Sequence, residues 1–142
     1  FDALENGAKL CAVDPRFSRT AAKADEWVGL RPGTDAAFVI GLLNVLVAEG
    51  MVDEGYLRRH TNAPFLVKPD GRLLRVAELA GPASADDFVV WSASAGGPVP
   101  SRSEAAADAT LAGTRAVALA DGSTLSCRTA WELMLEAWAI YT

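Results

Sequence analysis

The sequence predicts an α/β fold, with part of a parallel sheet near the N-terminus followed by β-hairpins and a C-terminal helix. Residues 9–13 and 27–31 are short continuous apolar runs without alternation, which is typical of parallel strands covered on both faces. Each run ends in a carboxylate or a glycine turn before a helical pattern begins, the arrangement with which α/β proteins build ligand-binding edges. From residue 62 onward, short strands alternate with turn signals instead.

The chain has 142 residues, 51% of them hydrophobic, which suffices for one sizeable core and favours a single domain. It opens on residues typical of a helix end closed by Gly7, and it finishes on an apolar helical pattern without a stop signal. We therefore expect residues 1–142 to be a fragment of one domain. Within it we expect an α/β part over 1–62, a hairpin-rich insertion over 63–128 and a closing helix over 129–142.

Charge and hydropathy exclude two classes of partner. The formal net charge is −5 and the basic residues are scattered, whereas a nucleic-acid backbone requires a clustered positive face. A mononucleotide or dinucleotide stays compatible, because backbone amides and helix N-termini can hold its phosphates. The longest apolar run, residues 36–48, is shorter than the roughly 18 residues of a membrane span. No leader is visible, so the sequence leaves a cytoplasmic or a periplasmic location open.

The first strand ends at Asp14-Pro15, because proline lacks a donor for the sheet. Ser18 or Thr20 then caps a short helix over residues 21–23, and the second strand follows.

The second strand leads into a turn over residues 32–35. Glycine supplies its unusual dihedral angles, Thr34 stands at the N-cap, and Asp35 lies in the first helical turn. The helix over 36–48 is apolar nearly all round, so we expect it to be buried against a sheet, with Gly50 ending it.

The rest of the chain is expected to form one short helix, three hairpins and a final helix. Asp53 caps the short helix, and a capping box over 129–132 opens the final one. The predicted hairpins pair 65–67 with 73–75, 88–91 with a strand near Val99, and 116–119 with 124–126. Residues 101–113 are predicted to be an exposed loop.

Two carboxylates are candidates for ligand contacts, and each has a simpler interpretation. Asp14 follows a parallel strand, where an acid can accept hydrogen bonds from ribose hydroxyls, but it also suits the start of a turn before Pro15. Spacing alone favours the turn, since no glycine-rich phosphate motif is present. Asp35 is stabilised by the helix dipole, yet it could also accept the two adjacent donors on the Watson–Crick edge of guanine.

The remaining chemistry-bearing residues favour structural roles. Cys11 and Cys127 are too far apart for a metal-ligand pattern and are expected to be small core residues. The only histidine, His60, is expected to cap the last carbonyls of its helix. The chain therefore lacks the set of ligands that a zinc site needs and the residue combination that nucleophilic catalysis needs. The four tryptophans are expected to pack in the core or on hairpins.

Two long stretches carry a resemblance to a known family. They are residues 13–27, VDPRFSRTAAKADEW, and residues 30–37, LRPGTDAA. With their spacing, they resemble the molybdopterin oxidoreductases of the dimethyl sulfoxide reductase superfamily. The similarity is loose over residues 76–126, and otherwise it continues through Glu49-Gly50, Asp53 and residues 61–67 to Trp131-Glu132-Leu133.

The resemblance implies a molybdenum or tungsten oxidoreductase that carries bis(molybdopterin guanine dinucleotide). It places residues 8–62 in a Rossmann-like part of a cofactor-binding domain that holds one guanosine end. Asp14 and Asp35 would then bind ribose and guanine, Arg16 would reach a phosphate oxygen, and the other positions would supply backbone contacts. The cofactor-binding positions that match the family pattern are Asp14, Pro15, Arg16, Phe17, Ser18, Gly33, Thr34 and Asp35.

The chain departs from the full family pattern, because it contains neither an iron–sulfur cysteine cluster nor a candidate for the metal-ligating side chain. We therefore expect no catalytic and no metal-ligating residue in it, and we expect the isolated chain to be inactive. The resemblance leaves a place for a 4Fe–4S cluster N-terminal to this chain. It implies a small-molecule redox substrate and allows an iron–sulfur electron-transfer subunit as a partner.

Two alternatives stay open at this stage. The superfamily includes non-redox members such as a hydratase. The chain could also be a free-standing nucleotide-binding or scaffold module without a metal centre.

Overall fold

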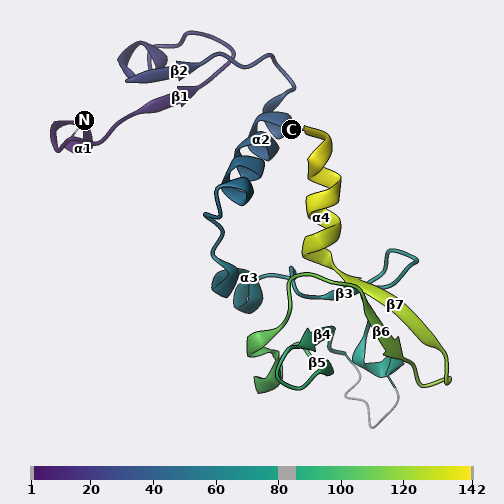
Figure 1. Ribbon diagram of the computed structural model, residues 1–142. Helices are drawn as coiled ribbons and strands as arrows, with labels where there is room; N and C mark the ends of the chain where they lie inside the picture. Colours follow the sequence, from purple (N-terminus) through teal and green to yellow (C-terminus); the bar gives the residue numbers. More distant parts are fainter. Residues whose placement is uncertain (1, 80–85, 142) are drawn as a thin grey trace. The chain divides into compact units, whose positions relative to one another are not determined.

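The computed structural model describes residues 2–79 and 86–141, and it divides them into two compact units (Figure 1). The N-terminal unit is described for residues 2–46, and the C-terminal unit extends from Val47 to Ile140. The two units are described separately below.

The N-terminal unit contains the predicted parallel strands. Its elements are α1 (Asp2–Glu5), β1 (Cys11–Val13), η1 (Ala21–Lys23), β2 (Glu26–Val28) and the greater part of α2 (Asp35–Ala48). Strands β1 and β2 pair in parallel, with Ala12 opposite Trp27 and Val13 opposite Val28. This confirms the predicted α/β class and the two predicted strands, although β2 ends at Val28 and not at residue 31.

The N-terminal unit buries little apolar surface. Ala12 and Ala21 are its only buried hydrophobic residues in the described part of the chain. No residue of α2 is buried, so the prediction that this helix packs against a sheet is wrong for this chain. Two strands of three residues each offer too little surface to cover a helix of 14 residues. The predicted core position of Cys11 is also wrong, since Cys11 is exposed.

The C-terminal unit is mostly antiparallel. Its elements are α3 (Glu54–His60), β3 (Leu66–Val67), η2 (Val76–Glu78), β4 (Val89–Ser92), β5 (Gly97–Pro100), η3 (Glu104–Asp108), β6 (Arg115–Ala118), β7 (Thr124–Thr129), α4 (Ala130–Trp138) and η4 (Ala139–Tyr141). Of η4, residues Ala139 and Ile140 belong to this unit. One sheet has the strand order β3-β7-β6, and a second consists of β4 and β5.

The three predicted hairpins form at or near the predicted positions. Lys68 and Arg72 close the first turn through a backbone hydrogen bond of 2.8 Å, and Gly71 adopts the φ of +82° that the turn requires. In the second hairpin Val90 lies opposite Val99. In the third, Val117 lies opposite Leu125.

The core of the C-terminal unit lies between these strands. Apolar side chains from five segments meet there with almost no exposure, and its buried members are Leu66, Leu74, Val76, Val89, Val117 and Cys127. The predicted core position of Cys127 is confirmed, and burial raises the pKa of its thiol.

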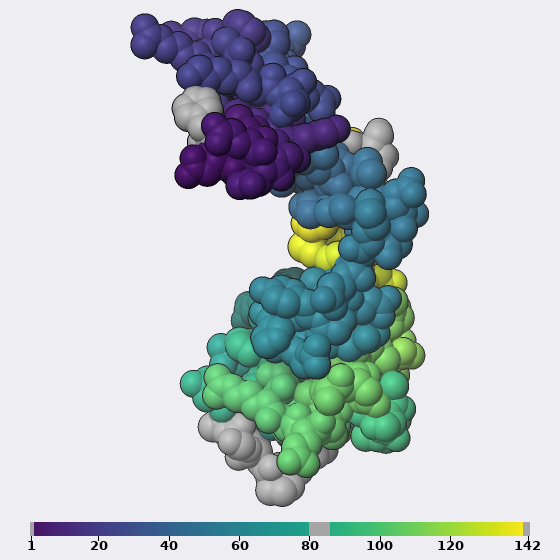
Figure 2. All heavy atoms as spheres, turned by 90° about the vertical axis from the view of Figure 1, so that its left-hand side faces the viewer, coloured from purple at the N-terminus to yellow at the C-terminus, as the bar shows by residue number. Residues whose placement is uncertain are grey.

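The segment over residues 101–113 is not simply the exposed loop that its composition predicts. It contains η3, and Ala106, Ala109 and Leu111 are buried. Figure 2 shows η3 on the surface of the C-terminal unit beside α3, where the Arg58 guanidinium donates to the Ala109 carbonyl at 3.0 Å. Small alanine side chains can be buried in a polar segment because they need little space.

Both predicted N-caps in this unit are present, but only half of the predicted capping box over 129–132 forms, since the Glu132 side chain pairs with Arg128. The Asp53 carboxylate accepts a hydrogen bond from the Tyr56 amide at 2.8 Å, and Thr129 Oγ1 accepts one from the Glu132 amide at 3.3 Å. Over residues 2–79 and 86–141, no helix has the length and hydrophobicity that a membrane crossing needs.

Candidate functional site

Two turns of the N-terminal unit begin where parallel strands end. Asp14 follows β1 directly, and residues 29–34 connect β2 to α2, which begins at Asp35. Because β1 and β2 are parallel neighbours, both turns leave the sheet at the same edge. The carboxyl edge of a parallel sheet is where α/β proteins bind their ligands.

The Asp14 turn is held by its own backbone and side chain. The Asp14 amide donates to the Val28 carbonyl at 3.2 Å, and Asp14 Oδ1 accepts from the Arg16 amide at 2.8 Å. The turn interpretation of Asp14 is therefore correct as local structure. The turn hydrogen bond engages only one oxygen of the carboxylate, because Oδ2 takes no hydrogen bond from the residues that the structure describes.

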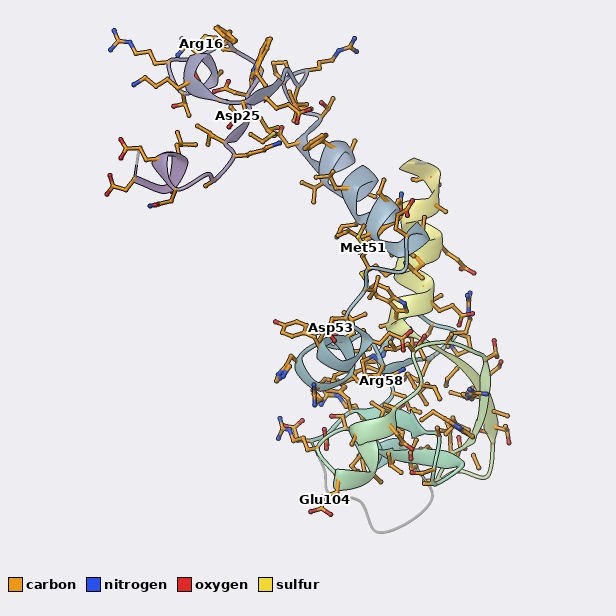
Figure 3. The ribbon with its side chains drawn as sticks, turned by 60° about the vertical axis from the view of Figure 1, so that its left-hand side comes forward. Arg16, Asp25, Met51, Asp53, Arg58 and Glu104 are labelled. Carbon is orange, nitrogen blue, oxygen red and sulfur yellow. The ribbon has the colours of Figure 1, made fainter. Side chains whose placement is uncertain are left out.

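The rest of the first turn is largely exposed. Pro15 and Arg16 lie on its outer side, and Figure 3 labels Arg16 there. Thr20 occupies the N-cap position of η1 without a side-chain cap bond, and it is Ser18 Oγ that accepts from the Ala21 amide, at 3.2 Å. The Phe17 ring is 60% exposed.

The second turn brings Asp35 to the start of α2. Gly33 has a φ of +83°, a conformation that other residues avoid. Thr34 stands at the predicted N-cap position, but its hydroxyl donates to the Arg31 carbonyl at 2.7 Å. The first helical hydrogen bond joins the Phe38 amide to the Thr34 carbonyl at 3.0 Å. The Asp35 carboxylate is exposed and forms no ion pair or hydrogen bond with the described residues.

This donor and acceptor set suits one end of a nucleotide. Asp14 Oδ2 and the Asp35 carboxylate can accept hydrogen bonds from sugar hydroxyls or from adjacent N–H groups of a base. The amides of residues 35–37 precede the first helical hydrogen bond of α2 and point out of its end. Helix-end amides and the guanidinium of Arg16 are each groups that bind phosphate oxygens.

Two supporting residues of this site were not expected from the sequence. Asp25 Oδ2 accepts from the Leu10 amide at 2.8 Å, which fixes the start of β1 (Figure 3). Trp27 was expected to pack in the core or on a hairpin, yet it is 41% exposed and its indole N–H donates to the Asp14 carbonyl at 3.0 Å. The one available signal was Gly29, whose lack of a side chain leaves room for a large ring two positions earlier.

Several chemistry-bearing side chains of the C-terminal unit have structural partners. Asp53 and Arg58, labelled in Figure 3, cap α3 and anchor it to η3. His60 lies at the end of α3 as predicted, with its ring 5.0 Å from that of Tyr56.

Two aspartates fasten the β4–β5 hairpin. Burial opposes the ionisation of Asp87, but hydrogen bonds from the Ser101 hydroxyl and from backbone amides outweigh it and lower the pKa of Asp87. Hydrogen bonds from Ser94 and Ser92 lower the pKa of Asp108. Within residues 2–79 and 86–141, no cluster of three or more His, Cys, Asp or Glu side chains is placed to hold a metal ion.

One family model and several known proteins match the sequence of this chain. The family model described as molybdopterin oxidoreductase matches residues 1–135. Perchlorate reductase subunit alpha of Dechloromonas aromatica is 34% identical over 99 residues, which cover 69% of this chain and 11% of that protein.

Two further relatives match shorter stretches. Formate dehydrogenase 2 subunit alpha of Nitratidesulfovibrio vulgaris is 47% identical over 68 residues, covering 48% of this chain and 7% of that protein. Respiratory nitrate reductase subunit alpha of Haloferax mediterranei is 36% identical over 87 residues, covering 61% of this chain and 9% of that protein. The chain thus spans only a small part of the length of these relatives.

Proposed function

This chain belongs to the molybdopterin oxidoreductase family, and on that basis we propose that its N-terminal unit holds the guanosine end of a bis(molybdopterin guanine dinucleotide) cofactor. The observation that carries the proposal is the pair of turns at one sheet edge. Each presents a carboxylate oxygen that takes no hydrogen bond from the described residues, Asp14 Oδ2 in the first turn and the Asp35 carboxylate in the second.

The residues have distinct roles in this proposal. Asp14 accepts from ribose hydroxyls, because it ends β1 as the acid of a nucleotide-binding strand does. Asp35 accepts from the two adjacent N–H donors of guanine, a pair that adenine lacks. Arg16 binds a phosphate oxygen. The backbones of Pro15, Phe17, Ser18, Gly33 and Thr34 shape the two turns around them.

We propose that the full-length protein is the catalytic subunit of a redox enzyme. The named relatives are two reductases and a dehydrogenase, which favours redox chemistry over the hydratase and scaffold alternatives. The molybdenum or tungsten centre of the cofactor supplies that chemistry when bound. This chain contributes the binding of the cofactor periphery and no catalytic residue.

The partners of the full-length enzyme follow from the same proposal. It acts on a small-molecule redox substrate, chosen by residues around the metal and outside this chain. Two of the named relatives carry the description "subunit alpha" of a reductase, which supports a further subunit as a partner, and we propose that it is an iron–sulfur electron-transfer subunit. A 4Fe–4S cluster N-terminal to this chain would link that subunit to the cofactor.

An Asp35→Ala substitution in the full-length protein tests the nucleotide assignment. Losing a charged hydrogen-bond acceptor costs about 1.5–3 kcal/mol, which weakens binding about tenfold or more. We expect guanine nucleotide and molybdenum per polypeptide to fall together, measured by chromatography after acid hydrolysis and by elemental analysis. Glu54→Ala is the matched control, because Glu54 is also an exposed first residue of a helix. Unchanged nucleotide content in Asp35→Ala would contradict the proposal.

A further inference from the structure

Three of the four polar atoms of Asp14 are already engaged within the N-terminal unit. Its amide donates to Val28, its Oδ1 accepts from Arg16, and its carbonyl accepts from the indole N–H of Trp27 at 3.0 Å. Oδ2 is the polar atom of Asp14 that is left for a ligand. The first two contacts come from backbone groups close to the turn. The third comes from a side chain, and it is therefore the one that depends on residue type.

Trp27 also contacts the turn through its ring. The Trp27 and Phe17 rings meet edge to face, with centroids 5.1 Å apart and planes at 80°. Phe17 is 60% exposed and Trp27 is 41% exposed, so the pair lies on the surface. The aromatic contact thus stabilises the Asp14 turn at Phe17, three residues after the hydrogen-bonded carbonyl of Asp14.

Gly29 makes room for this placement of the indole. A Cβ atom at residue 29 would lie 3.1 Å from two ring carbons of Trp27, closer than ordinary van der Waals contact. The indole therefore lies against the Gly29 backbone, toward the carboxyl end of β2, and this position brings its N–H to the Asp14 carbonyl. Any side chain at residue 29 would displace the ring.

We propose that Trp27 is a positioning residue of the nucleotide-binding edge: its indole N–H and its ring hold the Asp14–Ser18 turn so that Asp14 Oδ2 is presented to the ligand before it binds. The inference rests on the proposed function for the identity of the ligand, a guanosine nucleotide. A turn that is already ordered loses less conformational entropy when the ligand binds. Loss of the Trp27 contact therefore weakens binding even though no contact with the ligand is removed.

The most specific variant changes only the indole N–H group of Trp27. Benzothienylalanine, introduced at residue 27 by amber suppression in the full-length protein, keeps the bicyclic ring and replaces the N–H by sulfur. We expect the holoenzyme to lose cofactor roughly three- to tenfold faster in dilute urea, the ratio expected for one neutral hydrogen bond. Loss is measured as guanosine monophosphate released by acid hydrolysis from the remaining protein.

Two further variants grade the effect. Trp27→Ala removes both the N–H and the ring contact with Phe17, and it should give the fastest loss. Gly29→Ala keeps the indole but displaces it, and it should give a smaller acceleration. The matched control is benzothienylalanine at residue 131, since Trp131 also forms an edge-to-face pair, with Trp138, but lies in the C-terminal unit. It should leave the rate unchanged.

A second readout separates positioning from general stabilisation. In the apoprotein, amide hydrogen exchange of a peptide over residues 13–20 should accelerate in the benzothienylalanine variant at residue 27, while the global unfolding midpoint stays within error. A lower midpoint with unchanged local exchange would mean a merely structural tryptophan and would overturn the inference.

The two proposals fail differently. If Asp35→Ala lowers nucleotide content but the sulfur isostere at residue 27 changes neither cofactor loss nor local exchange, the positioning role is overturned and the binding site stands. If Asp35→Ala and Asp14→Ala both retain full nucleotide content, the proposed function is overturned, and the positioning role with it.

Discussion

The two units of this chain organise their residues in opposite ways. The C-terminal unit buries six apolar side chains in one cluster between its strands, among them Leu66, Val117 and Cys127. The N-terminal unit buries only Ala12 and Ala21 among its described hydrophobic residues and leaves Val39, Leu42 and Val45 about half exposed. Hydrophobic burial therefore holds the C-terminal unit together, whereas hydrogen bonds at turns define the local structure of the N-terminal unit.

The same turn device has different consequences in the two units. Asp14, Asp70 and Asp121 each accept a hydrogen bond from the amide two residues later, at 2.8, 3.0 and 2.9 Å. At Asp70 and Asp121 the turn closes a hairpin between antiparallel segments, so the chain returns along its own strand. At Asp14 the partner strand is parallel, so the turn leads away and leaves the carboxylate at an open sheet edge.

The largest expected difference between the units concerns large-to-small substitutions. Leu66→Ala creates a cavity at a fully buried site and should cost about 2–5 kcal/mol of unfolding free energy, whereas Leu42→Ala, at a half-exposed site, should cost less than about 1 kcal/mol. Urea unfolding of the 142-residue chain, followed by hydrogen exchange of β3 and α2 peptides, measures both. Equal costs would show that the burial contrast is wrong.

The two threonines that precede helices sharpen the contrast. Thr129 is fully buried, donates to the Leu111 carbonyl at 2.7 Å and caps α4, so Thr129→Ala should cost about 2 kcal/mol. The Thr34 hydroxyl donates to the nearby Arg31 carbonyl in an exposed turn, and Thr34→Ala should cost less than about 1 kcal/mol. Thermal unfolding of both variants compares them directly, and a larger cost at Thr34 would reverse the expected order.

A smaller effect is expected from acid. The pKa of Asp87 lies below its ordinary value of 3.8, since hydrogen bonds to the carboxylate outweigh the effect of burial. Its contribution to stability is therefore complete above the unfolded-state pKa and is lost as the pH falls through the lower folded-state pKa. We expect the β4–β5 hairpin to loosen only below about pH 4.

Asp87→Asn provides the control for this pH dependence. Asparagine keeps the size of the side chain but cannot ionise, so the variant should be less stable than the parent at pH 7 and should lose less stability between pH 4 and pH 2. Chemical denaturation across that range measures both slopes. Parallel profiles for the parent and the variant would show that Asp87 does not carry the acid sensitivity.

The sequence was most informative where a local rule decides the structure. The end of β1 at Asp14, the caps at Asp53 and Thr129 and the turn at Gly71 depend on a few neighbouring residues, and all four are present. The carboxyl-edge position of Asp14 and Asp35 also followed from strand and helix patterns alone.

The predictions that were wrong or missing concern contacts between residues that are distant in sequence. The apolar composition of α2 predicts burial but does not say whether this chain contains a surface to cover it. The burial of Ala106 and Ala109 depends on packing against Val90, which a Ser- and Ala-rich segment does not reveal. The hydrogen bond from Trp27 to Asp14 spans 13 residues and two strands, so spacing rules could not find it.

The most direct test compares Asp14→Ala with Asp121→Ala in the full-length protein. Both substitutions remove the same kind of turn hydrogen bond from an aspartate to the amide two residues later. Only Asp14 lies at the proposed nucleotide-binding edge, so we expect guanine nucleotide per polypeptide to fall in Asp14→Ala and to stay at the parent level in Asp121→Ala. Equal nucleotide content in the two variants would contradict the assignment of this edge to the guanosine end of the cofactor.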